Sequence, residues 1–441
     1  MSAKAARDFL VTPGGKLTGH IRVPGDKSIS HRALILGAIA EGTTQVTGFL
    51  ESTDCIATRK ALQALGVKIR INAAAAELTV QGVGLHGLQA SPATLDLGNS
   101  GTAMRLLCGV LAGQGFVSSL TGDESLRRRP MRRVIEPLAR MGVTIDSEQG
   151  CAPVTVHGRG ALKPLRHELP IASAQVKSAL LLAGLNAEGY TWLREPGISR
   201  DHAERMLEAF GCPCLHVDGW VGVHGGAPLT GLPIKVPGDL SSAAFFIVGA
   251  AMQRDSDLIL EQVGVNPTRS GVLTLLRKMG ADIHLSNERM AGREPVADIE
   301  IKGTALHGIH ITPEHVPLAI DELPVLMIAA AQARGDTVLE GAAELRVKES
   351  DRLQAIAEGL RKLGVKVELW ADGMRVTGVK TFAGGEIDSH GDHRIAMAFA
   401  MAGLRACAPI RIRDCRNVKT SFPGFAALAR DAGLELEEVQ R

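Results

Sequence analysis

The stretch that decides the fold is Val23-Pro-Gly-Asp-Lys-Ser-Ile-Ser-His-Arg32, which separates an alternating apolar segment from a continuous apolar run. Pro24 and Gly25 end the first segment, as expected where a strand passes into a loop. Ser28 or Ser30 is placed to cap an apolar helix over residues 33–40. Lys27 and Arg32 would then lie at a helix N-terminus, where unpaired backbone N–H groups favour a bound anion. The alternative is a capped helix with two solvated cations.

The same turn recurs later in the chain as Val236-Pro-Gly-Asp-Leu-Ser-Ser-Ala243. An apolar run again follows, but this copy has neither the lysine nor the arginine. The repetition predicts two pseudo-equivalent lobes that share a turn, only one of which carries the charges. The chain would cross between the lobes near residues 25 and 238, so that residues 1–24 with 239–441 form one lobe and residues 25–238 form the other.

Length and composition limit the class of protein. The 441 residues are enough for two or three domains, each with its own core. The net charge is only +2 and aromatic residues make up 3%, which argues against nucleic acid or a membrane surface as the partner. No apolar run approaches the roughly 18 residues of a membrane span, and the N-terminal segment MSAKAARDFL has no signal core. We therefore expect a soluble, cytoplasmic protein.

The seven cysteines agree with a reducing compartment, because their number is odd and their spacing irregular. Cys212, Cys214 and His216 share one face of an expected strand and could begin a metal site. No fourth ligand is apparent, and small buried side chains on a strand explain the pattern better. The sequence therefore predicts no metal.

One pattern recurs at intervals of about 70 residues, too long for a solenoid repeat. Each copy is an amphipathic helix closed by a glycine and followed by a short strand, which is a helix-face template with a C-terminal glycine. The glycines are Gly66, Gly142, Gly211, Gly280, Gly364 and Gly433. We expect an α/β fold of two pseudo-symmetric lobes with three such units each and a cleft between them. The N-terminal strand, about residues 8–23, would pack with the C-terminal half.

Cations gather at or just before the starts of these helices: Arg127, Arg128, Arg129, Arg132 and Arg133 at the second, Arg200 at the third, Lys348 and Arg352 at the fifth, and Lys419 before the sixth. A cation at a helix N-terminus opposes the dipole and is unfavourable unless an anion lies between them. The repetition favours a polyanionic ligand held by several helix N-termini. For the run 127–133, exposure to solvent is an equally good interpretation.

Several other segments carry chemistry. Residues 97–105, LGNSGTAMR, form a glycine-rich turn before an apolar helix and suit an anion, although they are no Walker motif. Ser173 and Gln175 offer neutral donors at another helix start. Acids lie among cations at Asp321-Glu322, in residues 346–352 and in residues 388–394. This arrangement suggests proton transfer beside a bound anion, and a salt-bridged hinge is the alternative.

Taken together, the ordered motifs resemble the family of 5-enolpyruvylshikimate-3-phosphate synthases, an enolpyruvyl transferase family, along nearly the whole chain. The motifs are GDKSISHR at 25–32, GNSGTAMR at 98–105, RRP at 128–130, SAQ at 173–175, RVKESDR at 346–352, DHRIAM at 392–397 and NVKTSFP at 417–423. The pair of SAQ with Arg200 is similar to the class II form, and Gly101 is the residue of glyphosate-sensitive members.

The resemblance implies transfer of the enolpyruvyl group of phosphoenolpyruvate to the 5-hydroxyl of shikimate 3-phosphate, with release of phosphate, through a tetrahedral ketal. This is a step of the shikimate pathway to chorismate and the aromatic amino acids. It further implies lobes of three βαβαββ units arranged as an inside-out α/β barrel, small-molecule substrates, no metal or organic cofactor, and a monomer without nucleic acid or membrane partners.

The resemblance also assigns residues. Implied contacts of shikimate 3-phosphate are Lys27, Ser28, Arg32, Ser173, Ala174, Gln175, Arg200, Asp321 and Lys348. Implied contacts of phosphoenolpyruvate are Lys27, Asn99, Gly101, Thr102, Arg129, Gln175, Arg352, Arg394 and Lys419. The implied catalytic groups are Asp321 as the base for the 5-hydroxyl, Lys348 as its assistant, Glu349 as the proton carrier for the methylene carbon, and Lys27. Bidentate arginines and lysine point charges suit a carboxylate and a phosphate.

Two alternatives stay open at this point. A UDP-N-acetylglucosamine enolpyruvyl transferase shares the architecture, but its members usually carry a cysteine on the loop that corresponds to residues 122–130, where this sequence has none. A nonenzymatic anion- or RNA-binding protein could use the arginine run at 127–133, but near-zero net charge and few aromatic residues argue against it.

Overall fold

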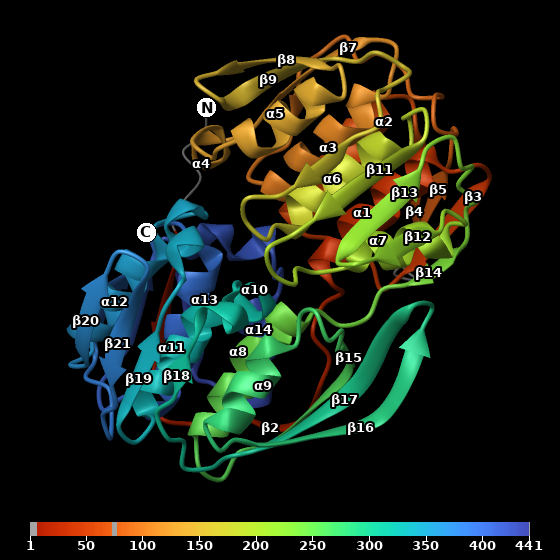
Figure 1. The fold of residues 1–441 in the computed structure, drawn as a ribbon. Helices are drawn as coiled ribbons and strands as arrows, with labels where there is room; N and C mark the ends of the chain where they lie inside the picture. The colour runs from red at the N-terminus through yellow and green to blue at the C-terminus, as the bar shows by residue number, and fades with distance from the viewer. Residues whose placement is uncertain (1–6, 73–76, 441) are drawn as a thin grey trace. The chain divides into compact units, whose positions relative to one another are not determined.

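The computed structural model describes residues 7–72 and 77–440; residues 1–6, which begin the segment without a signal core, lie outside this part. The chain separates into two compact units (Figure 1). Unit 1 comprises Met1–Pro24, Gly238–Arg289 and Pro295–Arg441, and unit 2 comprises Gly25–Pro237 with Met290–Glu294. Gly238, which lies in the second V-P-G-D turn, therefore groups with unit 1. Residues 290–294, the tip of a hairpin, group with unit 2.

The sheets of the described residues share one plan, in which a parallel pair is extended by two antiparallel strands. This order matches the βαβαββ unit expected from the sequence. In unit 2 the sheets are β14(Pro233–Lys235)-β3(Thr43–Thr47)-β5(Glu77–Gln81)-β4(Lys68–Asn72), β6(Leu95–Asp96)-β7(Val117–Thr121)-β9(Cys151–His157)-β8(Thr144–Glu148) and β10(Arg166–Glu168)-β11(Tyr190–Arg194)-β13(Trp220–His224)-β12(Cys214–Val217).

Unit 1 repeats this plan with strands from both ends of the chain. Its sheets are β16(Asp282–Ala291)-β17(Glu294–Lys302)-β15(Asp257–Gly264)-β2(Thr18–Ile21), β18(His310–Ile311)-β19(Asp336–Leu339)-β21(Gly373–Thr377)-β20(Lys366–Trp370) and β22(Gly385–Asp388)-β23(Ile410–Arg413)-β1(Arg7–Val11)-β24(Leu436–Gln440). The tip of the β16–β17 hairpin is the part that groups with unit 2.

The single N-terminal strand expected over residues 8–23 is wrong in extent, because the structure has two strands there. Pro13 and two glycines with positive φ, Gly14 at 98° and Gly15 at 89°, interrupt the segment. As a result β1 pairs with β23 and β24, whereas β2 pairs in parallel with β15. Both strands do pack with the C-terminal half, as expected.

Two classes of helix cover these sheets. The inner helices are apolar on almost every face and lie in the cores: α1(Lys27–Ile39), α3(Gly101–Ala112) and α6(Ala174–Gly184) in unit 2, and α8(Leu240–Met252), α11(Leu323–Gln332) and α13(His393–Ala402) in unit 1. The outer helices have one buried face: α2(Thr53–Ala64), α5(Arg132–Arg140) and α7(His202–Ala209), then α9(Gly271–Lys278), α12(Arg352–Lys362) and α14(Phe425–Ala432).

The six predicted C-terminal glycines follow the outer helices, and all have φ between 84° and 110°. This is the left-handed conformation that glycine adopts without a steric penalty. The prediction of a glycine-closed repeat is therefore confirmed, as are the α/β class and the two pseudo-symmetric lobes.

The predicted helix cap is wrong. Helix α1 begins at Lys27, earlier than expected, and its cap is Asp26, whose carboxylate accepts a 2.8 Å hydrogen bond from the backbone N–H of Ile29. Ser28 and Ser30 lie within the first turns instead. The short carboxylate of Asp26 reaches the third N–H of the helix, which is the usual geometry of a cap.

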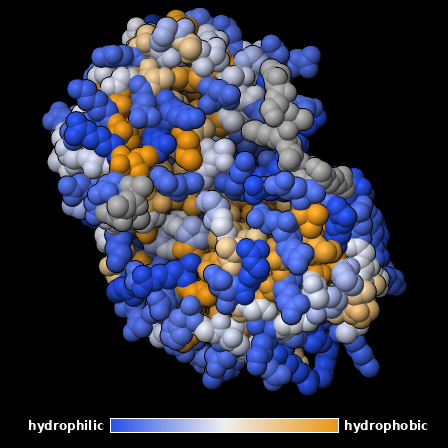
Figure 2. Space-filling view, turned by 180° about the vertical axis from the view of Figure 1, so that it is seen from behind, coloured by the Kyte–Doolittle hydropathy of each residue, from blue (hydrophilic) through white to orange (hydrophobic). Residues whose placement is uncertain are grey.

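Hydrophilic residues dominate the face seen in Figure 2, with smaller hydrophobic areas between them. Within residues 7–72 and 77–440, we find no helix with the length and apolar character needed to span a bilayer.

The close packing of α3 on α6 yields a first prediction. A methyl group added at Gly109 on α3 would lie 2.0 Å from the backbone oxygen of Ala179 on α6, whereas one added at Gly115 would meet nothing within 4 Å. We expect Gly109→Ala to destabilise the fold by about 1–3 kcal/mol or more, since backbone cannot move aside cheaply. Gly115→Ala should stay within about 0.5 kcal/mol of the parent chain. Urea denaturation of both variants checks this, and equal midpoints would contradict the packing described.

Candidate active site

In unit 2, the motifs singled out in the sequence lie at the N-terminal ends of the inner helices. GDKS begins α1, GNSGT begins α3 and SAQ begins α6. Hydrogen bonds join these turns: Arg32 Nη2 donates to Ser178 Oγ at 2.6 Å, and Gln175 Nε2 donates to Thr102 Oγ1 at 2.9 Å. The structure therefore brings together in one cluster residues that the sequence separates by more than a hundred positions.

Lys27 and Arg32 both lie in this cluster, in different surroundings. Lys27 forms an ion pair of 2.5 Å with the buried carboxylate of Asp54. Arg32 is 4% exposed, and its Nε has no hydrogen-bond partner within the described residues. Burial lowers the pKa of Arg32 to about 10, against the opposing effect of Glu204, and the charge of Arg200 lowers it further. A buried, incompletely paired guanidinium near a second arginine is a suitable receptor for an anion.

His31 lies beneath the same turn and serves as a neutral spacer. Its Nδ1 is 2.8 Å from Thr58 Oγ1 and its Nε2 is 3.4 Å from Ser100 Oγ. Burial, together with the charges of Lys27 and Arg32, lowers the pKa of His31 well below its ordinary value. The ring therefore joins α1, α2 and the start of α3 without adding a charge.

The glycine-rich turn places Asn99 and Gly101 against Arg129. Asn99 donates to Asp123 Oδ2 at 2.8 Å and accepts from Arg129 Nη2 at 2.9 Å. A methyl group added at Gly101 would lie 3.0 Å from the guanidinium nitrogens of both Arg105 and Arg129. Gly101 thus allows two guanidinium groups to approach the backbone at one point.

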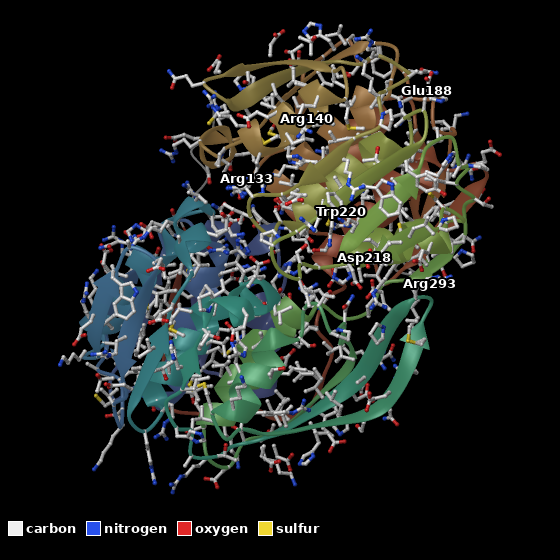
Figure 3. The ribbon with its side chains drawn as sticks, viewed as in Figure 1. Arg133, Arg140, Glu188, Asp218, Trp220 and Arg293 are labelled. Atoms are coloured by element: carbon white, nitrogen blue, oxygen red, sulfur yellow. The ribbon has the colours of Figure 1, made fainter. Side chains whose placement is uncertain are left out.

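The arginine run at 127–133 divides into two kinds of residue. Arg129 is 7% exposed and belongs to the cluster. Arg127, Arg128 and Arg132 are exposed, and Arg128 pairs with Glu124 on the surface. Arg133, labelled in Figure 3, lies in the first turn of α5. Most of the run therefore fits the interpretation of solvated side chains, and Arg129 fits the interpretation of an anion contact.

In unit 1, the remaining predicted residues gather around Arg352, the first residue of α12, which is 1% exposed. Its guanidinium donates to Asp392 Oδ2 at 2.8 Å, to Glu349 Oε2 at 2.6 Å and to Asp321 Oδ1 at 3.4 Å. Burial alone would lower the pKa of Arg352, but the carboxylates of Asp392, Glu349 and Asp321 raise it well above the ordinary value. The arginine is permanently charged and holds both predicted proton carriers.

Arg394 and Lys348 complete this second cluster. Arg394 Nη1 donates to the backbone oxygen of Asp321 at 2.9 Å, and its Nη2 lies 3.6 Å from the Asp321 carboxylate. Removal from water lowers the pKa of Lys348, although the neighbouring Asp321 and Glu344 oppose the shift. An ammonium group with a lowered pKa can exchange a proton more readily than an ordinary lysine.

Lys419 is a further predicted residue of unit 1. It belongs to a 3₁₀ turn, Cys415–Thr420, and lines a cavity of about 210 Å³ together with Arg7, Asn417, Phe422 and Arg430.

The second V-P-G-D turn accounts for the missing charges of the repeat. Asp239 caps α8 just as Asp26 caps α1, and its carboxylate accepts a 2.6 Å bond from Arg269. In this copy of the turn the carboxylate of Asp239 is paired with a side chain of the protein itself, Arg269. The uncharged Leu240 stands where the first copy has Lys27.

Three contributors were not among the predicted site residues. Arg105 donates to Gln175 Oε1, Asp54 pairs with Lys27, and Asp392 pairs with Arg352. Arg105 and Asp392 lie within quoted motifs, so their position beside the predicted residues was a usable signal. Asp54 lies in the first turn of α2, in a segment that carried no motif, and only the fold brings it to Lys27.

Comparison with known proteins first gives the class. The chain has the fold of an enolpyruvyl transferase: the structure of the enolpyruvyl transferase NikO from Streptomyces tendae matches with a TM-score of 0.80 at 16% identity, covering 99% of this chain and 100% of that one. At this identity the likeness shows the fold alone.

The family follows from closer matches. The sequence model of EPSP synthase (3-phosphoshikimate 1-carboxyvinyltransferase) matches residues 11–428. The 3-phosphoshikimate 1-carboxyvinyltransferase of Alkalilimnicola ehrlichii is 59% identical over 430 residues, 97% of this chain and 96% of that protein. The EPSP synthase structure from Acinetobacter baumannii is 52% identical with a TM-score of 0.87, covering 99% and 100% of the two chains. The chain belongs to the EPSP synthase family, which confirms the predicted transferase over both alternatives.

The buried arginine of unit 1 yields a second prediction. We expect Arg352→Met to destabilise the fold at pH 7 by about 3–5 kcal/mol, because it leaves buried carboxylates without their cation. Arg375→Met, which removes an exposed arginine paired with Glu368 at 3.1 Å, should cost about 1 kcal/mol or less. Chemical denaturation of both variants checks this.

The stability difference between Arg352→Met and the parent chain should depend on pH. Burial would raise the pKa of Asp392, but Arg352 overcomes this and lowers it, so the pair stabilises the parent chain until the pH falls through that lowered pKa. In Arg352→Met, protonation of Asp392 relieves the unpaired charge. The stability gap between variant and parent should therefore narrow as the pH falls from 7 towards 4, and a gap independent of pH would contradict the charge account.

Proposed function

We propose that this chain carries out its family's transfer through the two clusters described above, adding the 5-hydroxyl of shikimate 3-phosphate to phosphoenolpyruvate and then eliminating phosphate. The observation that carries the proposal is the buried guanidinium of Arg352, which bonds both Glu349 and Asp321. A guanidinium group that can bind an anion is thereby bonded to two carboxylates that can exchange protons.

The binding roles follow the chemistry of each cluster. For shikimate 3-phosphate we propose contacts with Lys27, Ser28, Arg32, Ser173, Ala174, Gln175 and Arg200 in unit 2 and with Asp321 and Lys348 in unit 1. For phosphoenolpyruvate we propose Lys27, Asn99, Gly101, Thr102, Arg129 and Gln175 in unit 2 and Arg352, Arg394 and Lys419 in unit 1. The buried Arg32 and Arg129 support these roles, since planar guanidinium groups pair with phosphate and carboxylate at two points.

The addition step would form a bond between the 5-oxygen and C2 of phosphoenolpyruvate. Asp321 takes the proton from the hydroxyl, and the neighbouring Lys348, with its lowered pKa, assists this transfer. Glu349 gives a proton to the methylene carbon, so a tetrahedral ketal results. In the elimination step Glu349 takes back a proton from the methyl group, the double bond forms again, and the bond between C2 and the phosphate oxygen breaks. The phosphate leaves with the bonding electron pair and takes up the proton that Asp321 gained in the addition step, which restores the base.

The double role of Glu349 has a physical basis in Arg352. The 2.6 Å bond from Arg352 favours the ionised carboxylate when no substrate is bound. The carboxylate of phosphoenolpyruvate would compete for the same guanidinium and place a negative charge beside Glu349. Both effects raise the affinity of Glu349 for a proton, so the arrival of substrate would prepare the acid that the addition step needs.

The finer points of setting are also proposals. We propose that residues 1–24 with 239–441 and residues 25–238 form the two functional lobes, supported by the division of contacts into two units at nearly these positions. We propose a monomer in the cytoplasm that acts on small molecules without nucleic acid. The seven cysteines are free throughout the described residues, which agrees with a reducing compartment.

The proposed proton carriers give a third prediction. Glu349→Gln keeps the shape of the side chain but cannot exchange a proton, so we expect kcat to fall by roughly 10²–10⁴-fold with smaller effects on substrate binding. Asp321→Asn should behave similarly. Glu358→Gln is the control and should stay within about threefold of the parent. Glu358 lies on α12, which begins three residues after Glu349, and its carboxylate accepts from Gln354 at 2.6 Å. Phosphate release measures all three, and near-parental turnover of either acid variant removes that residue from its role.

Gly101 gives a fourth prediction. Gly101→Ala should fold normally, because the atoms that its methyl group meets are the flexible ends of Arg105 and Arg129. Displacement of these ends should raise KM for phosphoenolpyruvate. Glyphosate, a longer anion that competes for this pocket in the family, should lose about tenfold more affinity than the substrate, within the usual range for overpacking. The measurement is the inhibition constant of glyphosate for Gly101→Ala and for the control Gly115→Ala. If the two variants have equal inhibition constants, Gly101 does not line the pocket.

A further inference from the structure

A buried ion cluster that has no part in the proposed chemistry lies directly behind the residues assigned to shikimate 3-phosphate in unit 2. Lys177 Nζ, on α6, is 2.8 Å from Glu195 Oε2 and 2.7 Å from Glu204 Oε1. The three side chains are only 6%, 8% and 4% exposed. Although burial would lower the pKa of Lys177, its two carboxylate partners raise it, so the ammonium stays charged. The cluster therefore has a net charge of about −1.

The two carboxylates of this cluster differ in what else they hold. Glu195 Oε1 accepts the backbone N–H of Ser173 at 2.8 Å, and the Ser199 hydroxyl lies within donating distance of both Glu195 oxygens, at 2.8 and 2.7 Å. Within the described residues Glu204 forms its ion pair with Lys177, and its Oε2 has no hydrogen-bond partner. Its charge also acts on the buried Arg32, without a hydrogen bond between them. Glu195 thus bonds two segments of the proposed site, and Glu204 bonds neither.

Those two segments are the ones that present the substrate contacts. Ser173 is the cap of α6 and begins the SAQ motif, and Ser199 immediately precedes Arg200. Both segments are loops, which without a fixed partner would sample several backbone conformations. A single buried carboxylate with bonds to both restricts them together and is itself fixed by Lys177.

We propose that Glu195 is a positioning residue for shikimate 3-phosphate, which holds the Ser173 and Arg200 segments in their binding geometry while Lys177 keeps its carboxylate in place. This rests on the proposed function, in which Ser173 and Arg200 contact that substrate. Glu195 itself touches neither substrate in this account, so its effect should appear in substrate affinity and leave the proton transfers unchanged.

Charge and geometry predict opposite effects for Glu195, which makes the proposal testable. Shikimate 3-phosphate is an anion, so removing a negative charge near its site should by itself tighten binding. Glu195→Gln and Glu204→Gln remove the same charge from the same lysine. We expect Glu195→Gln to weaken binding by about tenfold because hydrogen bonds to the two segments are lost or misdirected, and Glu204→Gln to leave binding unchanged or tighter.

The experiment compares the two full-length variants with the parent by titration calorimetry with shikimate 3-phosphate and by steady-state kinetics. The expected result is a KM for shikimate 3-phosphate about tenfold higher in Glu195→Gln only, with kcat and the KM for phosphoenolpyruvate within about threefold of the parent. Equal affinities in the two variants, or an equal loss in both substrates' KM values, would overturn the proposal, because either would indicate a general structural effect.

Two further variants keep the outcome clear. Ser199→Ala leaves the ion cluster intact and removes one of the bonds to Glu195, so it serves as the test if Glu195→Gln fails to fold. An affinity for shikimate 3-phosphate that is about threefold weaker supports the proposal, and an unchanged affinity overturns it. Ser173→Ala and Arg200→Ala test the proposed site itself. If these two variants bind shikimate 3-phosphate with the affinity of the parent, the proposed site is wrong. If they lose binding while Glu195→Gln keeps the affinity of the parent, only the positioning role of Glu195 is contradicted.

Discussion

The unsatisfied N–H groups at the start of each inner helix are the constraint on which the rest of the structure depends. A helix buried on all sides cannot leave these donors to water, so each first turn needs an acceptor from the protein or from a ligand. Asp26, Ser100 and Ser173 supply caps in unit 2, and Asp239 and Asp392 do so in unit 1. Each cap accepts one or two donors, and the positive end of the helix remains available to an anion.

The two units differ in the charged side chains that surround the N-termini of their inner helices. In unit 2 the helix starts are surrounded by cations, and Arg32 retains a buried Nε without a partner in the described residues. In unit 1 acids balance the cations: three carboxylates bond Arg352, and Asp239 bonds Arg269. The same repeated architecture therefore yields a cluster suited to holding anions and another suited to moving protons. The repeat supplies equivalent positions, and the side chains placed there decide which chemistry each unit performs.

The sequence predicted most of what depends on local geometry and less of what depends on distant contacts. The glycines that close the outer helices were predictable because each needs a left-handed backbone wherever it occurs. The cap of α1 was assigned to Ser28 or Ser30 since three good capping residues lie within five positions, and only the observed helix start selects Asp26. Glu195 carried no signal, because its partners Ser173 and Lys177 become its neighbours only when α6 packs beside β11. Ser199 is only four residues away in the sequence, but a serine at that distance does not by itself indicate a bond. Buried polar partners of this kind follow from the tertiary fold, whereas the motifs around them follow from the chain.

The position of β1 determines when the molecule can be completed during its synthesis. This strand is synthesised long before its partners β23 and β24, where Phe9 lies opposite Ile412 and Glu438. Its sheet must wait until almost the whole chain has emerged, and closing so long a loop carries an entropic cost that local pairing does not. Unit 2 depends on the later chain only for the five residues Met290–Glu294, so its core can assemble while the first strand is still unpaired. Until β23 and β24 have been synthesised, both edges of β1 stay unpaired, and an unpaired strand edge is a site for pairing with other chains.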